Sequence, residues 1–198
     1  FRSLKELPES SYTEVIPSES ARLLYEDQVS IALIPVAEFA NHGGLAYLPY
    51  GIACPKSVQS VCLFSNQPID SIDTIYLDHS SKTSVVLLKL LLIEYFKKPL
   101  KTIKFIRENP LSIVSSIGKN CAGLLIGDAA TKAKNSFNYC YDLGEAWNSL
   151  TNLPFVFALW SYKPASLTNE QIKSLSEQIE FGLQSKSVFA REYADDNE

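Results

Sequence analysis

Short apolar runs alternate with helix-forming segments along most of this chain, and no other feature of the sequence constrains the fold as strongly. Residues 29–34 (VSIALI) and 74–77 (TIYL) are short, apolar and rich in β-branched side chains, as expected of buried strands. Residues 85–96 form a longer block that is apolar nearly all round and predicts a buried helix. Because strands alternate with helices, we expect an α/β protein with mostly parallel sheets.

Two further apolar runs, SVCLFS at residues 60–65 and FVFALW at residues 155–160, are predicted strands that bracket a compact α/β unit. Two crossings that enclose one unit predict a two-lobed clamshell that holds its ligand between the lobes. We place the crossings near these two runs. Lobe 1 then comprises residues 1–65 and 161–198, and lobe 2 comprises residues 66–160.

The C-terminal region is predicted to be helical from Thr168. Thr168 and Gln171 have the spacing of a capping box, in which each side chain satisfies a backbone amide of the first helical turn. Apolar residues then recur at helical spacing along one face.

Charge and composition narrow the possible partners. The net charge is −4 and the basic residues are scattered, so we expect no nucleic-acid partner and no anionic membrane surface. The longest apolar block, residues 85–96, is interrupted by Lys89 and Glu94 and is too short to span a bilayer. The sequence carries no indication of oligomeric state.

The metal-ligating side chains form no pattern typical of a metal site. The four cysteines have no CxxC spacing, and His42 and His79 lie far apart in the sequence. A chain of this length needs no disulfide scaffold, so we expect reduced thiols and a cytoplasmic protein. We also expect no metal and no cofactor.

Residues 78–86 (DHSSKTSVV) gather four hydroxyl groups and one lysine at the joint between a predicted strand and a predicted helix. The start of a helix carries unpaired N–H groups and a partial positive charge, and it can bind a carboxylate or a phosphate. Ser81, Thr83 and Ser84 supply hydroxyls, and Lys82 adds a full charge if it points toward the site. The serines could instead serve only as helix caps, but the number of neighbouring hydroxyls favours an anion site.

A second corner follows the apolar run in LLIGDAA. Gly127 suits a sharp turn or a close backbone approach to a ligand. An N-cap role for Asp128 is favoured by propensity, and the alternative is that its carboxylate faces the cleft and contacts a ligand hydroxyl. Ser60, just before the first predicted crossing, could reach the same cleft, although a local hydrogen bond is the more frequent role of such a serine.

A third stretch, YDLGEAW, contains Asp142, Glu145 and Trp147. Their helical spacing favours a solvated face with one buried aromatic ring over a functional site.

Together, these stretches resemble the MqnA family of menaquinone biosynthesis, the chorismate dehydratases of the futalosine route. The resemblance covers most of residues 17–160. It runs in chain order through PSESARLLYEDQVSIALIPVAEF, GIACPKSVQSVCLFS, LDHSSKTSVVLLKLLL, GLLIGDAA and YDLGEAWNSLTNLPFVFALW.

The resemblance implies a type 2 periplasmic-binding-protein fold and a hydro-lyase that converts chorismate to 3-[(1-carboxyvinyl)oxy]benzoate without a cofactor. We take Ser60 and Asp128 as the catalytic candidates. The candidates for substrate binding are Ser81, Lys82, Thr83, Ser84 and Gly127.

The chain also departs from the family pattern. Lys82 stands where the family usually has arginine, which weakens bidentate carboxylate binding while keeping the charge. The loop ACPKSVQS lacks the usual glycine. The family's first strand and a YLN-like turn, which contributes an asparagine to the cleft, should precede Phe1. The chain contains no methionine, so we expect the natural N-terminus to lie upstream.

The residue inventory contains no obvious histidine base, so our hypothesis is that the substrate's own side-chain carboxylate takes the ring proton while Ser60 helps to hold it. Asp128 is the alternative base. The chief rival function is a non-catalytic binding protein for a small carboxylate ligand, since the same clamshell serves in transport. A degenerate relative kept as an interaction protein, or a related enzyme of the same pathway, are further alternatives.

Overall fold

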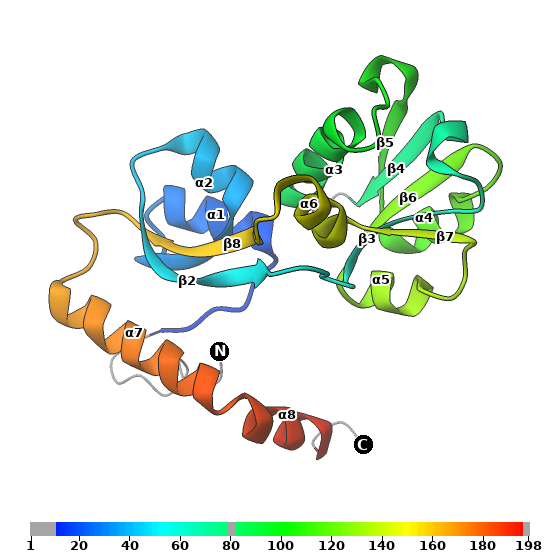
Figure 1. Cartoon of the computed structure of the whole chain (residues 1–198). Coiled ribbons are helices and arrows are strands. Elements are labelled where there is room, and N and C mark those ends of the chain that lie inside the picture. The colour runs from blue at the N-terminus through cyan, green and yellow to red at the C-terminus, as the bar shows by residue number, and fades with distance from the viewer. Residues whose placement is uncertain (1–10, 79–81, 196–198) are drawn as a thin grey trace.

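The computed structural model describes residues 11–78 and 82–195 of the chain. Two β-sheets form separate lobes that lie side by side, and a short helix, α6, lies between them (Figure 1). The smaller sheet is antiparallel throughout. Its strands, in order across the sheet, are β1 (Ile31–Pro35), β8 (Phe155–Tyr162) and β2 (Ala46–Cys54).

The larger sheet has five strands. In order across the sheet they are β5 (Lys104–Glu108), β4 (Thr74–Asp78), β6 (Cys121–Ile126), β3 (Val61–Ser65) and β7 (Tyr139–Asp142). The helices of this lobe are α3 (Lys82–Glu94), α4 (Pro110–Ser116), α5 (Gly127–Ala133) and α6 (Leu143–Thr151), with 3-10 turns η2 (Ile69–Ser71) and η3 (Leu100–Thr102). The helices that accompany the smaller sheet are α1 (Pro17–Tyr25), α2 (Val36–His42), α7 (Asn169–Gln184) and α8 (Lys186–Asp195).

The main hydrophobic core lies between the five-stranded sheet and helices α3 and α6. Ile75, Leu88, Leu91 and Leu124 have no exposed surface in this core. Full burial of each of these side chains contributes roughly 1.5–3 kcal/mol, so this core supplies much of the stability of the lobe. The helix predicted at residues 85–96 is present as α3, which begins and ends slightly earlier. It is not buried all round, because its opposite face exposes the apolar side chains of Val86, Leu90 and Ile93.

The α/β class is confirmed, whereas the expectation of mostly parallel sheets is wrong. Among the described strands, the only parallel pairs are β4 with β5 and β4 with β6. β3 runs antiparallel to both β6 and β7. A continuous apolar run indicates that a strand is buried on both faces, but it does not record the direction of the strand's neighbours, which depends on how the connections cross.

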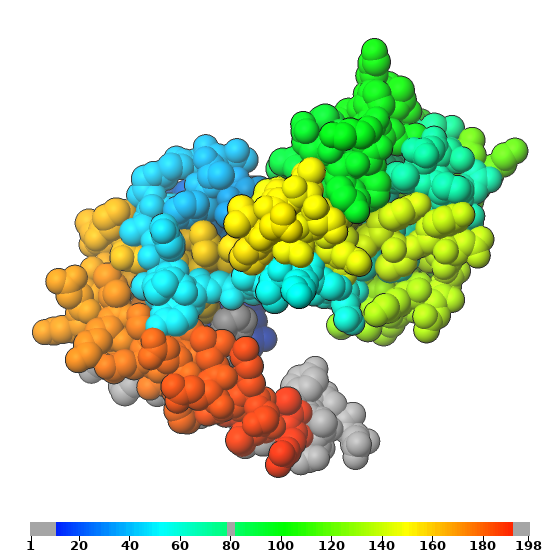
Figure 2. Space-filling view, viewed as in Figure 1, coloured from blue at the N-terminus to red at the C-terminus, as the bar shows by residue number. Residues whose placement is uncertain are grey.

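The passages between the lobes lie slightly earlier in the chain than predicted. The expected boundaries put residues 61–65 with lobe 1, but this segment is β3, which belongs to the five-stranded sheet. All of β8 belongs to the three-stranded sheet, so the connecting segments are residues 55–60 and 152–154. In the space-filling view, the first connection and α6 fill the space between the two lobes (Figure 2). That the two lobes bind a ligand between them stays a prediction.

Candidate functional site

Several of the predicted site residues meet at one edge of the five-stranded sheet. Val61 pairs with Ile126 and Cys62 with Asp142, so the start of β3 lies between the ends of β6 and β7. β4 runs parallel to β6, and its final residue, Asp78, is almost fully buried at the same edge. This edge therefore brings together the Ser60 loop, the turn after β6 and the approach to α3.

Ser60 lies directly beside Gly127. The Gly127 amide donates to the Ser60 carbonyl at 2.7 Å, and the Ser60 amide donates to the Val58 carbonyl at 2.7 Å. The Ser60 hydroxyl reaches the Val58 carbonyl only at 3.4 Å, which is a long contact for a hydroxyl donor. The backbone of Ser60 is therefore held firmly, while its half-buried hydroxyl has no strong partner within the described residues.

Gly127 and Asp128 form the turn between β6 and α5. Gly127 has a φ of +58°, a left-handed conformation that glycine adopts without strain, so the predicted sharp turn is confirmed. Asp128 lies in the first turn of α5 rather than at its N-cap, which is Ile126, and no side chain caps this helix. The N-cap interpretation of Asp128 is therefore wrong. Its carboxylate is exposed, and contact with a ligand hydroxyl stays a prediction.

The hydroxyl-rich joint is only partly described, because Ser81 lies outside the described residues. Thr83 and Ser84 occupy the first turn of α3 and are both buried. The Ala37 amide, in the first turn of α2, donates to the Thr83 hydroxyl at 3.4 Å. Helix α2 from the smaller lobe thus lies against the beginning of α3 from the larger one.

Lys82 joins the two lobes through an ion pair. Its Nζ lies 2.6 Å from Oε1 of Glu38 on α2, whose side chain is only 11% exposed. His42 Nδ1 lies 3.5 Å from the other carboxylate oxygen of Glu38. Partial burial, and then the Glu38 carboxylate, raise the pKa of the nearby Tyr25 hydroxyl. These groups line a cavity of about 250 Å³ between α1, α2 and α3. The substrate-binding role of Lys82 stays a prediction, since its amine here contacts a carboxylate of the protein.

Asp142 is the residue whose importance sequence reasoning missed. It caps α6, accepting hydrogen bonds from the amides of Gly144 at 2.8 Å and Glu145 at 3.0 Å. It also accepts from Ser57 Oγ at 2.7 Å and from the Gln59 amide at 2.6 Å, and so binds the loop that leads to Ser60. An aspartate just before a helix, as in YDLGE, is a recognised N-cap signal, but its second set of partners lies more than 80 residues earlier in the chain.

The electrostatics of Asp142 reflect these contacts. Partial burial alone would raise the pKa of its carboxyl group. Hydrogen bonds from the Ser57 hydroxyl and from the amides of Glu145, Gln59 and Val58 outweigh burial and hold the pKa below its usual value. The group is therefore a carboxylate at neutral pH.

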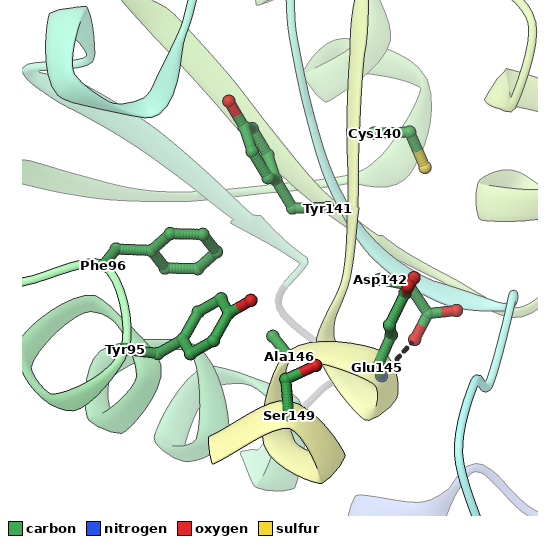
Figure 3. Close-up of a pocket in the computed structure, with 8 residues that line it drawn as sticks. All are labelled: Tyr95, Phe96, Cys140, Tyr141, Asp142, Glu145, Ala146 and Ser149. Atoms are coloured by element: carbon green, nitrogen blue, oxygen red, sulfur yellow. Dashed lines mark hydrogen bonds between the residues drawn. The ribbon is translucent and has the colours of Figure 1, made fainter.

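A second cavity, of about 260 Å³, lies between the end of α3, β7 and α6 (Figure 3). The rings of Tyr95, Phe96 and Tyr141 form one wall, and Asp142 and Glu145 lie on the other side. None of its lining residues is basic, and two of them carry carboxylates. The carboxylates in its wall therefore make this cavity unsuited to a ligand with several negative charges.

Helix α6 also ties together the two segments that connect the lobes. The Asn148 side-chain amide donates to the carbonyl of Pro55 at 3.2 Å and to that of Leu153 at 3.4 Å. The Trp147 indole donates to the Pro154 carbonyl at 3.3 Å. One helix thus contacts the passage from β2 to β3 and the passage into β8.

The described residues contain neither a cluster of metal-ligating side chains nor a membrane-spanning helix. No group of three or more histidine, cysteine, aspartate or glutamate side chains there is arranged to hold a metal ion. None of the described helices combines the length and the hydrophobicity needed to cross a bilayer.

The two lobes, the two passages between them and the polar sheet edge beside those passages define a type 2 periplasmic-binding-protein-like fold. The structure of protein AF1704 from Archaeoglobus fulgidus superposes with a TM-score of 0.68 at 20% identity, covering 93% of this chain and 69% of that one. The aliphatic sulphonate binding protein SsuA from Escherichia coli gives a TM-score of 0.65 at 15% identity, covering 97% of this chain and 67% of that one. These similarities show the fold alone.

The chain belongs to the menaquinone biosynthesis family, whose profile matches residues 2–195. The predicted family resemblance is thereby confirmed. The chain is also 32% identical over 167 residues to the chorismate dehydratase of Thermus thermophilus. This alignment covers 75% of the chain and 59% of the relative, so the chain spans well under two thirds of that protein's length.

Proposed function

We propose that the full-length protein carrying this chain is a chorismate dehydratase, a hydro-lyase that removes water from chorismate in menaquinone biosynthesis. The observation that carries the proposal is the corner where Ser60 contacts the Gly127–Asp128 turn, at the polar edge of the five-stranded sheet. Membership of the menaquinone biosynthesis family and similarity to the Thermus enzyme support it. The cytoplasm stays the predicted site of action.

The chemistry of chorismate suits the groups at this edge. Chorismate carries two carboxylates and one ring hydroxyl, and the amides at the start of α3, next to the hydroxyls of Thr83 and Ser84, favour a carboxylate. In the proposal, this turn, together with Ser81, Lys82 and the Gly127 backbone, binds the substrate. Ser60 and Asp128 contact the reacting part of the molecule.

The proposed reaction is an elimination that completes an aromatic ring. A proton leaves the ring carbon that bears the enolpyruvyl ether, and the electrons of that C–H bond form the third ring double bond. The neighbouring carbon loses its hydroxyl group, and the proton and the hydroxide leave together as water. Aromatisation makes the step strongly downhill, so positioning and exclusion of solvent water suffice for catalysis.

Each of the two catalytic candidates has a distinct role. The substrate's enolpyruvyl carboxylate takes the ring proton and passes it to the departing hydroxyl oxygen, which leaves as water and regenerates the carboxylate. The Ser60 hydroxyl holds that carboxylate in place. Asp128 accepts a hydrogen bond from the ring hydroxyl and orients it for departure. If Ser60 proves dispensable, Asp128 becomes the candidate base.

The test is incubation of the full-length protein with chorismate, followed by mass spectrometry and ultraviolet absorption. We expect an aromatic product that is lighter than chorismate by one water and still carries the enolpyruvyl group. Ser60→Ala should lower kcat by roughly 10²-fold or more, the usual size of a lost proton-transfer or positioning group. Ser149→Ala, on the exposed side of α6, is the matched serine control. Chorismate recovered unchanged contradicts the proposal.

The alternative is a binding protein for a small carboxylate that performs no chemistry. The shared fold with SsuA, a sulphonate binding protein, is the observation that favours it. Calorimetry distinguishes the two, because a pure binding protein titrates with chorismate to saturation and releases it intact.

A further inference from the structure

We propose that Asp142 is the positioning residue of the candidate site: its carboxylate holds the loop of residues 57–59 and so sets the place of Ser60 beside Gly127. The inference rests on the proposed function for the catalytic role of Ser60. The holding of the loop rests on hydrogen bonds within the described residues alone.

The two carboxylate oxygens of Asp142 have different partners. Oδ1 accepts from the amides of Gly144 and Glu145, and these two bonds are sufficient to cap α6. Oδ2 contributes nothing to the cap. It accepts from the Gln59 amide at 2.6 Å and from Ser57 Oγ at 2.7 Å. A residue that served only as an N-cap would leave this second oxygen to solvent.

The loop that Asp142 holds is in a conformation that needs support. Gln59 has a φ of +59°, which is uncommon for a residue other than glycine and persists where surrounding contacts hold it. The Val58 amide adds a third bond to Asp142, at 3.2 Å to Oδ1. Ser60 follows Gln59 directly, so the position and orientation of Ser60 depend on the bonds that hold residues 57–59.

The position of Ser60 also affects the turn at Gly127 and Asp128, because the two segments are hydrogen-bonded. The Ser60 carbonyl accepts from the Gly127 amide at 2.7 Å, and Gly127 precedes Asp128. A displaced loop would therefore change the distance between the two catalytic candidates. In a positioned site, small misplacements of reacting groups reduce the rate strongly.

The start of α6 also lies unusually close to this loop. A Cβ atom added at Gly144 would lie 2.7 Å from Cys54 Sγ and 3.1 Å from the Val58 amide nitrogen. The same Cβ would lie 3.2 Å from Asp142 Oδ1, so a larger residue here would crowd both the carboxylate and the loop. Gly144 and Asp142 of YDLGEAW therefore both allow the start of α6 to pack closely against the loop of residues 57–59.

The experiment uses three variants of the full-length protein. Asp142→Asn keeps an oxygen that can cap α6, because asparagine caps as well as aspartate does, but its NH₂ group cannot accept from the Gln59 amide. Ser57→Ala removes one loop bond and leaves the cap intact. Glu145→Gln removes a carboxylate from the same helix turn and serves as the charge-matched control.

Hydrogen exchange of backbone amides reports the positioning directly. In Asp142→Asn we expect exchange at Gln59 and Gly127 to rise by about 10-fold or more, the scale of a lost hydrogen bond to a charged group, with no comparable rise at Gly144 and Glu145. Ser57→Ala should show a smaller rise at the same loop amides, and Glu145→Gln none.

Kinetics separate positioning from stability. In Asp142→Asn we expect kcat for chorismate to fall by about 10–100-fold with a much smaller change in KM, since the loop acts on the reacting groups rather than on overall binding. Ser57→Ala should lie between Asp142→Asn and the wild type. Loss of folding alone would lower the amount of active enzyme without this order among the variants.

Two results overturn the inference: unchanged exchange at Gln59 and Gly127 in Asp142→Asn, or faster exchange there with wild-type kcat. Failure of the proposed function looks different. A Ser60→Ala protein with full turnover removes Ser60 from the reaction, while the exchange at Gly127 still decides whether Asp142 holds the loop.

Discussion

At the scale of single residues, two carboxylates organise the described part of the site. Asp142 is satisfied by amide and hydroxyl donors, whereas Glu38 lies next to the Lys82 amine and the His42 ring. Both carboxylates join segments that are distant in the sequence. Their contribution therefore depends on donors that local patterns do not reveal.

Lys82 and Glu38 form a pair that can be tested for coupling. Lys82→Ala leaves the largely buried Glu38 without its nearest cation, so we expect the free energy of unfolding to fall by about 1 kcal/mol, since Lys82 itself is partly exposed. In the Glu38→Gln background the same change should cost less. Urea unfolding of the wild type, both single variants and the double variant measures the coupling. Strictly additive effects would contradict a functional ion pair.

The pKa of Asp142 predicts a pH dependence of stability. Because this pKa is lower in the folded protein than the usual value of about 3.9, the stabilisation is complete above about pH 5, where the group is ionised in both states. It is lost as the pH falls toward the lower pKa of the folded state. The gap in thermal midpoint between the wild type and Asp142→Asn should therefore be constant near neutral pH and shrink in acid. A gap that widens in acid would reverse the assigned sign.

At the scale of elements, helix ends are where the sequence is most informative. The predicted capping box of α7 is confirmed, with Thr168 Oγ accepting from the Gln171 amide at 3.2 Å and the Gln171 side chain accepting from the Thr168 amide at 2.9 Å. The cap of α6 by Asp142 follows the same logic. Burial of α3 was only half predicted, because its apolar composition does not say which face lacks a neighbour.

The α7 cap gives a local stability prediction. Thr168→Ala should destabilise the start of α7 by about 1 kcal/mol, while Thr168→Ser keeps the hydroxyl acceptor and should be nearly neutral. Amide exchange in residues 169–172 is the measurement, because α7 makes few buried contacts and responds locally. Equal exchange in the two variants would show that the hydroxyl bond contributes nothing.

At the scale of the whole molecule, α6 is the element that contacts both passages between the lobes. Asn148 bonds to Pro55 in one passage and to Leu153 in the other. α6 also packs its buried face on the core of the larger lobe through Leu143 and Ala146. The geometry between the lobes therefore depends on a helix that belongs to one of them.

Removal of the two Asn148 hydrogen bonds should make the distance between the lobes more variable. In Asn148→Ala we expect a broader distribution of distances between spin labels placed one on each lobe, with unchanged helix content by circular dichroism. Ser149→Ala, next to it on the exposed side of α6, is the control. Identical distributions in Asn148→Ala and the wild type would mean that the two passages are held by the sheets alone.

Sequence reasoning succeeded where the signal is local or a motif is specific. Strands β1, β3, β4 and β8, helices α3 and α7, the turn at Gly127 and the capping box at Thr168 follow from periodicity and backbone preference. The family resemblance rested on five stretches in chain order. Strand direction, the sheet to which residues 61–65 belong and the N-cap of α5 were predicted wrongly.

By itself, the sequence determined the α/β class, several of the strands and helices, and the family, because these depend on residues that are neighbours along the chain. Only the tertiary structure decided that Lys82 contacts Glu38 and that Asp142 holds the loop before Ser60. The partners in those contacts are 44 and more than 80 positions apart, respectively. A hydrogen bond or an ion pair depends on the distance between atoms in space. The path of the chain between the two lobes and the order of strands in each sheet set that distance.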